Sequence, residues 1–183
     1  MRDASLVLFI AAGIAAAAGL AALWTLTRYR DRGGSRAASA TTVVASDTGV
    51  APVMMLRDPG IGLRGKPDYV LREQHGDREL LVALELKPNR RSNRVYESDV
   101  IQVAAYTLML RAEYGDQAAP FGYMRYPSGT VRVELKPALQ SRVAEIVRAI
   151  RRDRRAAVVH RSHDNAARCI SCAMRSSCNE RLA

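Results

Sequence analysis

The stretch from Pro67 to Lys87, PDYVLREQHGDRELLVALELK, decides the fold of this chain. Its two outer segments, residues 67–73 and 79–87, are rich in Val, Leu and Tyr, which favour β-strands. The residues between them, 74–78, carry the turn chemistry of a Gly-Asp pair. We therefore predict a β-hairpin, and the rest of the chain is interpreted outward from it.

The hairpin gathers charged side chains on one face of the sheet. Residue numbers across a hairpin add to a nearly constant value, so symmetric closure places Asp68 opposite Leu84 or Glu85. Glu85 and Lys87 are two residues apart on one strand, so their side chains leave the same face. Two close carboxylates repel each other unless a cation lies between them, and hard oxygen ligands suit Mg²⁺ or Mn²⁺. The alternative is that Asp68 is a turn residue and that Glu85 and Lys87 lie on a solvated strand face.

The pattern becomes helical from residue 96 to residue 114, with Ser98 or Asp99 as the expected N-cap. Gln102 and Tyr106 are four residues apart, so a helix stacks them on one face. For Tyr106 alone, packing in the core is the alternative to a functional contact. We expect this helix to pack against the sheet.

The flanking segments complete an α/β order of strands, helix, strands and helix. Residues 53–57 predict a first strand, and residues 121–126 and 130–136 predict a second hairpin. Pro137 opens a last helix. The apolar positions of that helix recur with helical spacing: Leu139, Val143, Ile146, Val147 and Ile150.

These elements carry an ordered set of motifs. Gly-x-Pro-Asp ends at Asp68, Glu-x-Lys spans residues 85–87, and Asp-x-x-Gln-x-x-x-Tyr spans residues 99–106. The combination resembles the PD-(D/E)XK nuclease superfamily over about residues 52–178, and its Gln-x-x-x-Tyr element is similar to that of the RecB-like exonuclease branch. The resemblance implies a restriction-endonuclease-like core, a mixed β-sheet flanked by helices.

The resemblance also implies roles for individual residues. Asp68 and Glu85 would be the ligands of Mg²⁺ or Mn²⁺, and the backbone carbonyl of Leu86 would complete the protein's share of the coordination. Lys87 would orient the attacking water or stabilise the developing charge. The residues expected to contact nucleic acid are Gln102 and Tyr106, by resemblance, and Arg90, Arg91 and Arg94, which follow Lys87 in a loop that could alternatively be a merely solvated one.

All three cysteines lie in the last fifteen residues, as Cys169-x-x-Cys172-x5-Cys178. Clustered thiolates suit an iron–sulfur cluster or zinc, and the spacing resembles the carboxyl-terminal triplet of the iron–sulfur CRISPR-associated exonucleases. That family adds a fourth cysteine before the nuclease core, and this chain has none. Three alternatives stay open: a 4Fe-4S cluster with three cysteine ligands, a Zn²⁺ site completed by His160 or His163, or three free thiols.

The amino-terminal run from Leu6 to Thr27 carries no charge and is long enough to cross a bilayer as one helix. Arginines follow the run, so the positive-inside rule places the carboxyl-terminal domain in the cytoplasm. A signal peptide cleaved near residues 38–40, Ala-Ser-Ala, is the alternative. No acid or histidine that would support the metal, as the RecB-like branch often has near its amino terminus, is evident in this run.

We therefore predict a transmembrane helix at residues 5–27, a flexible linker at 28–51, the nuclease-like core at 52–157 and a cysteine tail at 158–183. The net charge of +10 fits a nucleic-acid partner. The expected function is a membrane-anchored, divalent-metal-dependent DNA nuclease, an exonuclease on single-stranded ends. The alternatives are a catalytically silent nucleic-acid-binding module and, third, a redox or metal sensor. The arginines from residue 148 to residue 155 suit either nucleic acid or an anionic membrane surface.

Overall fold

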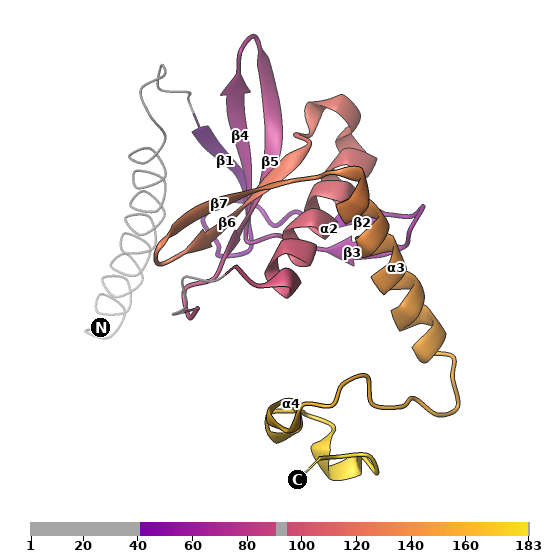
Figure 1. Ribbon diagram of the computed structural model, residues 1–183. Coiled ribbons are helices and arrows are strands. Elements are labelled where there is room, and N and C mark those ends of the chain that lie inside the picture. The colour runs from indigo at the N-terminus through magenta and orange to yellow at the C-terminus, as the bar shows by residue number, and fades with distance from the viewer. Residues whose placement is uncertain (1–40, 91–94, 183) are drawn as a thin grey trace, which may run out of the picture. The chain divides into compact units, whose positions relative to one another are not determined.

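The computed structural model describes residues 41–90 and 95–182, and its central element is a five-stranded mixed sheet (Figure 1). The strand order is β1-β4-β5-β6-β7. Strands β5 and β6 run parallel, and the other neighbouring pairs are antiparallel. The predicted mixed sheet is confirmed. Its strands are β1 (Thr41–Ser46), β4 (Tyr69–His75), β5 (Arg78–Leu86), β6 (Phe121–Tyr126) and β7 (Gly129–Glu134).

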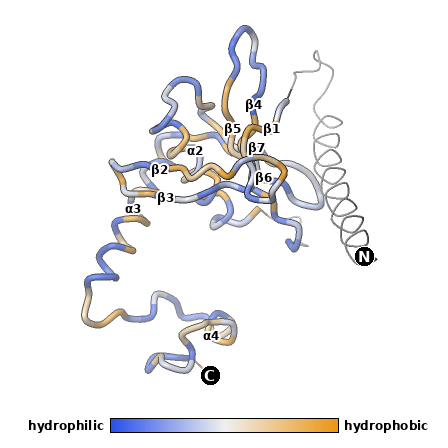
Figure 2. The backbone as a smooth tube through the Cα atoms, turned by 180° about the vertical axis from the view of Figure 1, so that it is seen from behind, coloured by the Kyte–Doolittle hydropathy of each residue, from blue (hydrophilic) through white to orange (hydrophobic). Residues whose placement is uncertain are grey.

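The β4–β5 hairpin has the register on which the charged face depends. Tyr69 pairs with Leu84, so one further step places Asp68 opposite Glu85. The sequence left Leu84 or Glu85 open as the facing residue, and the structure selects Glu85. Gly76 has a φ of 62°, the left-handed conformation that a tight turn requires and glycine adopts without strain. Figure 2 shows the hairpin tip as hydrophilic and the inner part of β5 as hydrophobic.

Helix α2 (Glu97–Tyr114) makes the crossover between the parallel strands β5 and β6. It packs on one face of the sheet, where Met109 and Leu110 join a buried cluster with Val70 and Ala83. Gly122 on β6 allows the close approach of this helix. A Cβ there would meet side-chain atoms of α2 at 2.7 and 2.8 Å and a backbone oxygen of β5 at 3.1 Å.

A second, two-stranded sheet packs against α2. It consists of β2 (Leu56–Asp58) and β3 (Leu63–Gly65), and α2 packs against β2. The strand predicted at residues 53–57 is therefore shorter and later than expected. A 3₁₀ turn at Gly115–Gln117 follows α2.

Two local predictions are wrong. Residues 41–46, assigned to the flexible linker, form the edge strand β1, because Thr and Val in TTVVAS fit the pleat and pair with β4. The N-cap of α2 is Tyr96, not Ser98 or Asp99. Asp99 instead lies buried inside the first turn of the helix.

The chain divides within α3 (Pro137–Asp153) into two compact units, the first ending at Glu145 and the second being Ile146–Ala183. The second unit also contains α4 (Ala166–Ile170) and a 3₁₀ turn at Arg175–Ser177. The boundary predicted between core and tail, at residues 157 and 158, falls inside this second unit.

The predicted transmembrane segment, Leu6 to Thr27, lies outside the described residues. Among the helices of residues 41–90 and 95–182, none has the length and apolar character needed to span a membrane.

Candidate functional site

Asp68 lies directly before β4 and is held from two sides. Its Oδ2 accepts a hydrogen bond from the Leu86 N–H at 2.7 Å. Its backbone carbonyl accepts one from the Asp47 N–H at 3.0 Å. The half-buried carboxylate is therefore fixed to β5, and its backbone is fixed to the segment after β1.

Glu85 is the buried acid of the group, with 6% of its surface exposed. Its Oε1 accepts hydrogen bonds from Lys87 Nζ at 2.9 Å and from Gln102 Nε2 at 2.7 Å. Its Oε2 is buried and has no hydrogen-bond partner among the described residues. Leaving a buried polar atom unsatisfied costs about 1–3 kcal/mol, so this oxygen favours a bound ligand.

The pKa of the Glu85 carboxyl is raised above its ordinary value. Burial is the largest cause, and the charge of Asp68 adds to it. The hydrogen bond and charge of Lys87 act in the opposite direction without cancelling the effect. The two acids therefore interact electrostatically, as their facing register requires, and a cation beside them would favour the charged form of both.

Lys87 and two residues of α2 complete a connected network around Glu85. The Lys87 ammonium also donates to Gln102 Oε1 at 2.7 Å, and Gln102 Nε2 lies 3.2 Å from the Tyr106 hydroxyl. Burial raises the pKa of Tyr106, and the negative charges of Glu85 and Asp68 raise it further. The structure thus brings together five predicted residues from three segments of the chain.

Asp99, which the sequence placed in the motif of residues 99–106 and also offered as an N-cap, is a buried carboxylate next to this network. Asp99 is 3% exposed, accepts a hydrogen bond from the Tyr126 hydroxyl at 3.0 Å and pairs with Arg90 at 3.2 Å. The Arg90 guanidinium lies 4.5 Å from the centre of the Tyr96 ring. Asp99 and Gln102 are three residues apart on α2, and that spacing was the one sequence signal that connected Asp99 with the site.

An ion pair that the sequence did not predict lies beside the site, between Lys66 and Asp47. The Lys66 ammonium donates to the Asp47 carboxylate, and both side chains are partly exposed. The charge of Asp47 is one of the causes that raise the pKa of Tyr106. Asp47 gave no sequence signal, because its segment has the composition of a linker and only the β1–β4 pairing brings it to Asp68.

Comparison with known proteins decides the family. Residues 10–179 match the model of the PD-(D/E)XK nuclease superfamily. The chain belongs to this superfamily. A matching solved structure is the crystal structure of SSO0001, at 12% sequence identity and a TM-score of 0.40. The match covers 79% of this chain and 60% of that one, so this chain spans less than two thirds of that protein, and the likeness carries no argument about function. No curated protein matches the chain.

PD-(D/E)XK nucleases usually use Mg²⁺ or Mn²⁺, and the donor set of this chain fits such an ion. The unsatisfied Oε2 of Glu85 and the carboxylate of Asp68 are hard oxygen donors, and they face each other across the hairpin. Among the described residues no three His, Cys, Asp or Glu side chains gather as a metal site. Asp68 and Glu85 are therefore the two side-chain ligands that we assign among the described residues.

The roles predicted for the site residues stay predictions, including those of Leu86, Arg91 and Arg94. Leu86 lies between Glu85 and Lys87 and donates its N–H to Asp68, while the metal role of its carbonyl is untested. Arg91 and Arg94 lie outside the described residues. Arg90 is described, and its pairing with Asp99 shows that the loop after β5 is attached to α2 at this point.

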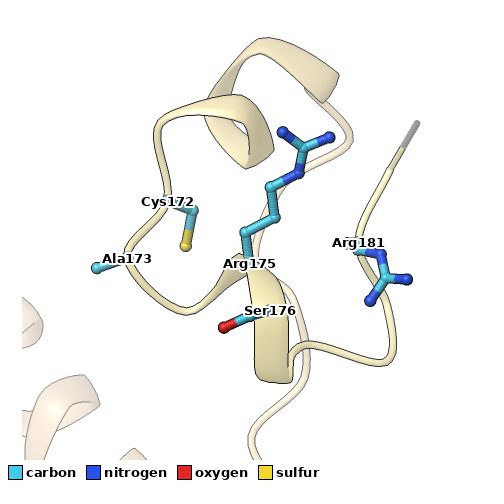
Figure 3. Close-up of a pocket in the computed structure, with 5 residues that line it drawn as sticks. All are labelled: Cys172, Ala173, Arg175, Ser176 and Arg181. Atoms are coloured by element: carbon cyan, nitrogen blue, oxygen red, sulfur yellow. The ribbon is translucent and has the colours of Figure 1, made fainter.

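The cysteine tail belongs to the second unit. Cys169 in α4 is 4% exposed, and its Sγ accepts a hydrogen bond from the Leu182 N–H at 3.4 Å. The Cys172 N–H donates to the Cys169 carbonyl at 3.2 Å, which forms the turn between them. Cys172, Arg175 and Arg181 are among the residues that line a hollow of about 540 Å³. Figure 3 shows these side chains.

The two histidines offered as a fourth ligand have other partners. His160 Nδ1 lies 2.5 Å from Glu180 Oε1, and His163 Nδ1 accepts the Asn165 N–H at 3.3 Å. Cys169, Cys172 and Cys178 form no disulfide, and among the described residues they do not gather with a third acid, histidine or cysteine as a metal site.

The raised pKa of Glu85 predicts a pH dependence of stability. A carboxyl whose pKa is higher in the folded state holds its proton longer there, so the free energy of unfolding falls as pH rises from the ordinary value of 4.5 toward the native value. Glu85→Gln removes this titration. Without added divalent metal, urea unfolding at a series of pH values should show the wild type losing stability relative to Glu85→Gln across that window. Adding Mg²⁺ should reduce the loss, and parallel curves for the two proteins would contradict the burial argument.

Proposed function

We propose that this chain is a divalent-metal-dependent deoxyribonuclease that cleaves single-stranded DNA from its ends. Membership of the PD-(D/E)XK nuclease superfamily supports a metal-dependent nuclease and a nucleic-acid substrate. The observation that carries the assignment to this site is Glu85. It is a buried acid with one unsatisfied oxygen, facing Asp68 and hydrogen-bonded to Lys87.

The residues of the site divide the work of phosphodiester hydrolysis. Asp68 and Glu85 would hold the metal, which when bound makes a water nucleophilic and neutralises charge on the phosphate. The Lys87 ammonium lies next to Glu85 Oε1 and is positioned to orient that water or to stabilise the developing negative charge. Gln102 contacts both Glu85 and Lys87, so it fixes the direction in which the ammonium points.

The preference for single-stranded ends is supported by the Gln-x-x-x-Tyr element, residues 102–106, which resembles the RecB-like branch. In the structure Gln102 touches the acid and the base directly, and Tyr106 lies within reach of Gln102. A strand that contacts Gln102 and Tyr106 would therefore be held next to Glu85 and Lys87. Arg90, with 43% of its side chain exposed, is offered as a further contact to the strand backbone.

Substitution of the acids tests the proposal. Asp68→Ala and Glu85→Ala should abolish hydrolysis of labelled single-stranded DNA under Mg²⁺ and Mn²⁺, because each removes a metal ligand. Lys87→Ala should lower turnover by about a hundredfold and keep most of the metal affinity, because the ammonium acts on the transition state. Equal activity in Glu85→Ala and wild type would assign the activity elsewhere, and the chain would be a silent nucleic-acid-binding module.

Glu73→Gln is the matched control for Glu85→Gln, which should also abolish hydrolysis because it removes a metal ligand. Glu73 is 3% exposed, and its Oε1, like Oε2 of Glu85, is buried without a hydrogen-bond partner in the described part of the chain. It lies on the other face of the sheet, where its Oε2 accepts the Tyr123 hydroxyl at 3.0 Å. Loss of a buried carboxylate alone therefore predicts similar damage in both variants, whereas our proposal predicts that folded Glu73→Gln keeps its activity.

We also propose that the chain is attached to the membrane by residues 5–27, with the nuclease domain in the cytoplasm. The support is the charge-free run from Leu6 to Thr27 and the arginines that follow it. The full-length protein should sediment with membranes and resist alkaline carbonate extraction. Recovery of a soluble protein that begins near residue 41 would favour the signal-peptide interpretation.

For the cysteine tail we propose metal ligation by Cys169, Cys172 and Cys178, with a 4Fe-4S cluster or Zn²⁺ as the alternatives. The support is their spacing and the absence of any other cysteine from the sequence. Protein purified anaerobically should contain either iron with broad visible absorbance or stoichiometric zinc. Finding neither metal would show that the thiols are free, and nuclease activity would survive because the acids do not depend on them.

A further inference from the structure

Four arginines surround a second hollow, distant in sequence from the catalytic residues. It has a volume of about 520 Å³ and is lined by Arg148, Arg151, Arg152, Arg155 and Ala156. All five residues belong to the second unit of the chain. Backbone hydrogen bonds from Arg154 to the Ile150 carbonyl and from Arg155 to the Arg152 carbonyl continue the helical path of α3 to this point. The backbone that carries the four arginines is therefore helical.

Helical geometry places these four side chains on one side of α3. At 3.6 residues per turn they fall within about 100° of the helix circumference. Arg148, Arg152 and Arg155 follow the i, i+4, i+7 spacing that stacks side chains along one stripe, and Arg151 lies beside them. We refer to these four residues as the arginine stripe.

The arginine stripe has an excess of positive charge that the described residues do not neutralise. Arg152 Nε lies 3.8 Å from Asp153 Oδ1, between two side chains that are 74% and 53% exposed. Within residues 41–90 and 95–182, no carboxylate forms an ion pair with Arg148, Arg151 or Arg155, and none lines the hollow. Like charges stacked at this spacing destabilise a helix, so a bound anion would relieve the repulsion between these arginines.

The opposite side of α3 distinguishes a nucleic acid from a membrane surface. The apolar stripe of the helix begins at Leu139, which packs on a buried cluster, and Val143, which is 2% exposed. A basic amphipathic helix that lies on a membrane immerses its apolar stripe between flanking basic residues. The later part of that stripe is not covered, since Ile150 is 53% exposed, and the arginines lie about opposite to it on the helix circumference, not beside it. This arrangement favours an anion that the arginines contact directly.

We propose that the arginine stripe binds the phosphodiester backbone of the nucleic-acid substrate, at a site separate from the catalytic acids. Guanidinium groups bind phosphate oxygens in bidentate geometry, and several of them along one stripe match the repeated phosphates of a strand. The proposal rests on the proposed nuclease function for the identity of the anion. It adds a second contact region that would hold the strand while its end is cleaved.

The test compares two pairs of substitutions in the full-length protein in mild detergent. Arg148→Gln with Arg152→Gln removes two charges from the stripe. The matched control, Arg72→Gln with Arg142→Gln, removes two surface arginines that are each 52% exposed and each pair with a glutamate. Both pairs are made in a Glu85→Gln background so that the labelled single-stranded oligonucleotide stays intact. Affinity is measured over a series of salt concentrations, and thermal melting checks that each variant is folded.

The stripe variant should bind at least tenfold more weakly at low salt. Its slope of log affinity against log salt should become shallower by about 1.4, because each phosphate that an arginine neutralises on a single strand contributes about 0.7 to the slope. The control should stay within twofold of the parent. Equal affinity and equal slope in the stripe variant and the control would overturn the proposal.

Two further measurements distinguish this proposal from a membrane-binding role of the arginine stripe and from a failure of the proposed nuclease function. Phosphatidylserine in mixed micelles of the same detergent is added as a competitor, and a stripe variant that changes competition by phosphatidylserine but not DNA affinity would assign the stripe to the membrane and overturn the proposal. The same arginine pair is also tested with Glu85 intact, where the DNA concentration that gives half the maximal rate should rise, whereas the Arg72→Gln with Arg142→Gln control should leave it unchanged. If wild type has no nuclease activity while the stripe variant still weakens DNA binding, the proposed function fails and the binding site stands.

Discussion

The register of the β4–β5 hairpin is the constraint on which the site depends. A shift of one residue would turn Glu85 and Lys87 to the other face of the sheet and separate them from α2. The Leu86 N–H to Asp68 Oδ2 hydrogen bond ties the acid before β4 to the strand that carries Glu85, and it forms only in the observed register. Because both faces of β5 are buried in hydrophobic clusters, the core that stabilises the sheet also fixes the position of the acids.

This constraint creates a site that is costly in the absence of a ligand. Glu85 is buried beside a second carboxylate, and one of its oxygens has no partner in the described residues. Lys87 and Gln102 donate hydrogen bonds to the other oxygen, Oε1, and so hold the carboxylate in one orientation. Gln102 belongs to α2, so this orientation depends on the packing of α2 on the sheet. The close contact at Gly122 allows that packing, so a glycine on β6 contributes to the geometry of an acid on β5. Functional sites commonly concentrate such costs, because an unsatisfied polar group gains most from its ligand.

The sequence predicted most of the sheet and the grouping of the candidate site residues, because both depend on local patterns. Strand alternation, the turn at Gly76 and the helical spacing of Gln102 and Tyr106 each lie within a few residues of one another. The features that it missed depend on contacts between distant segments. Strand β1 forms because an edge of β4 is available for pairing, and Asp99 is buried because Tyr126, 27 residues away, donates to it. The N-cap prediction failed because α2 begins at Glu97, so Asp99 lies inside its first turn, where its carboxylate accepts the Tyr126 hydroxyl.

A buried acid alone does not define the site, as the comparison of Glu73 with Glu85 shows. Both are almost fully buried on the central sheet, and each has one oxygen without a partner among the residues that the structure describes. The other oxygen of Glu73, Oε2, lies 3.1 Å from His75 Nε2 and 3.0 Å from the Tyr123 hydroxyl, and both groups can donate a hydrogen bond to it. Glu85 instead faces a second carboxylate and a lysine, so its surroundings favour a divalent cation and a polarised water. The chemistry is therefore set by the face of the sheet to which each acid points, and the hairpin register decides that face.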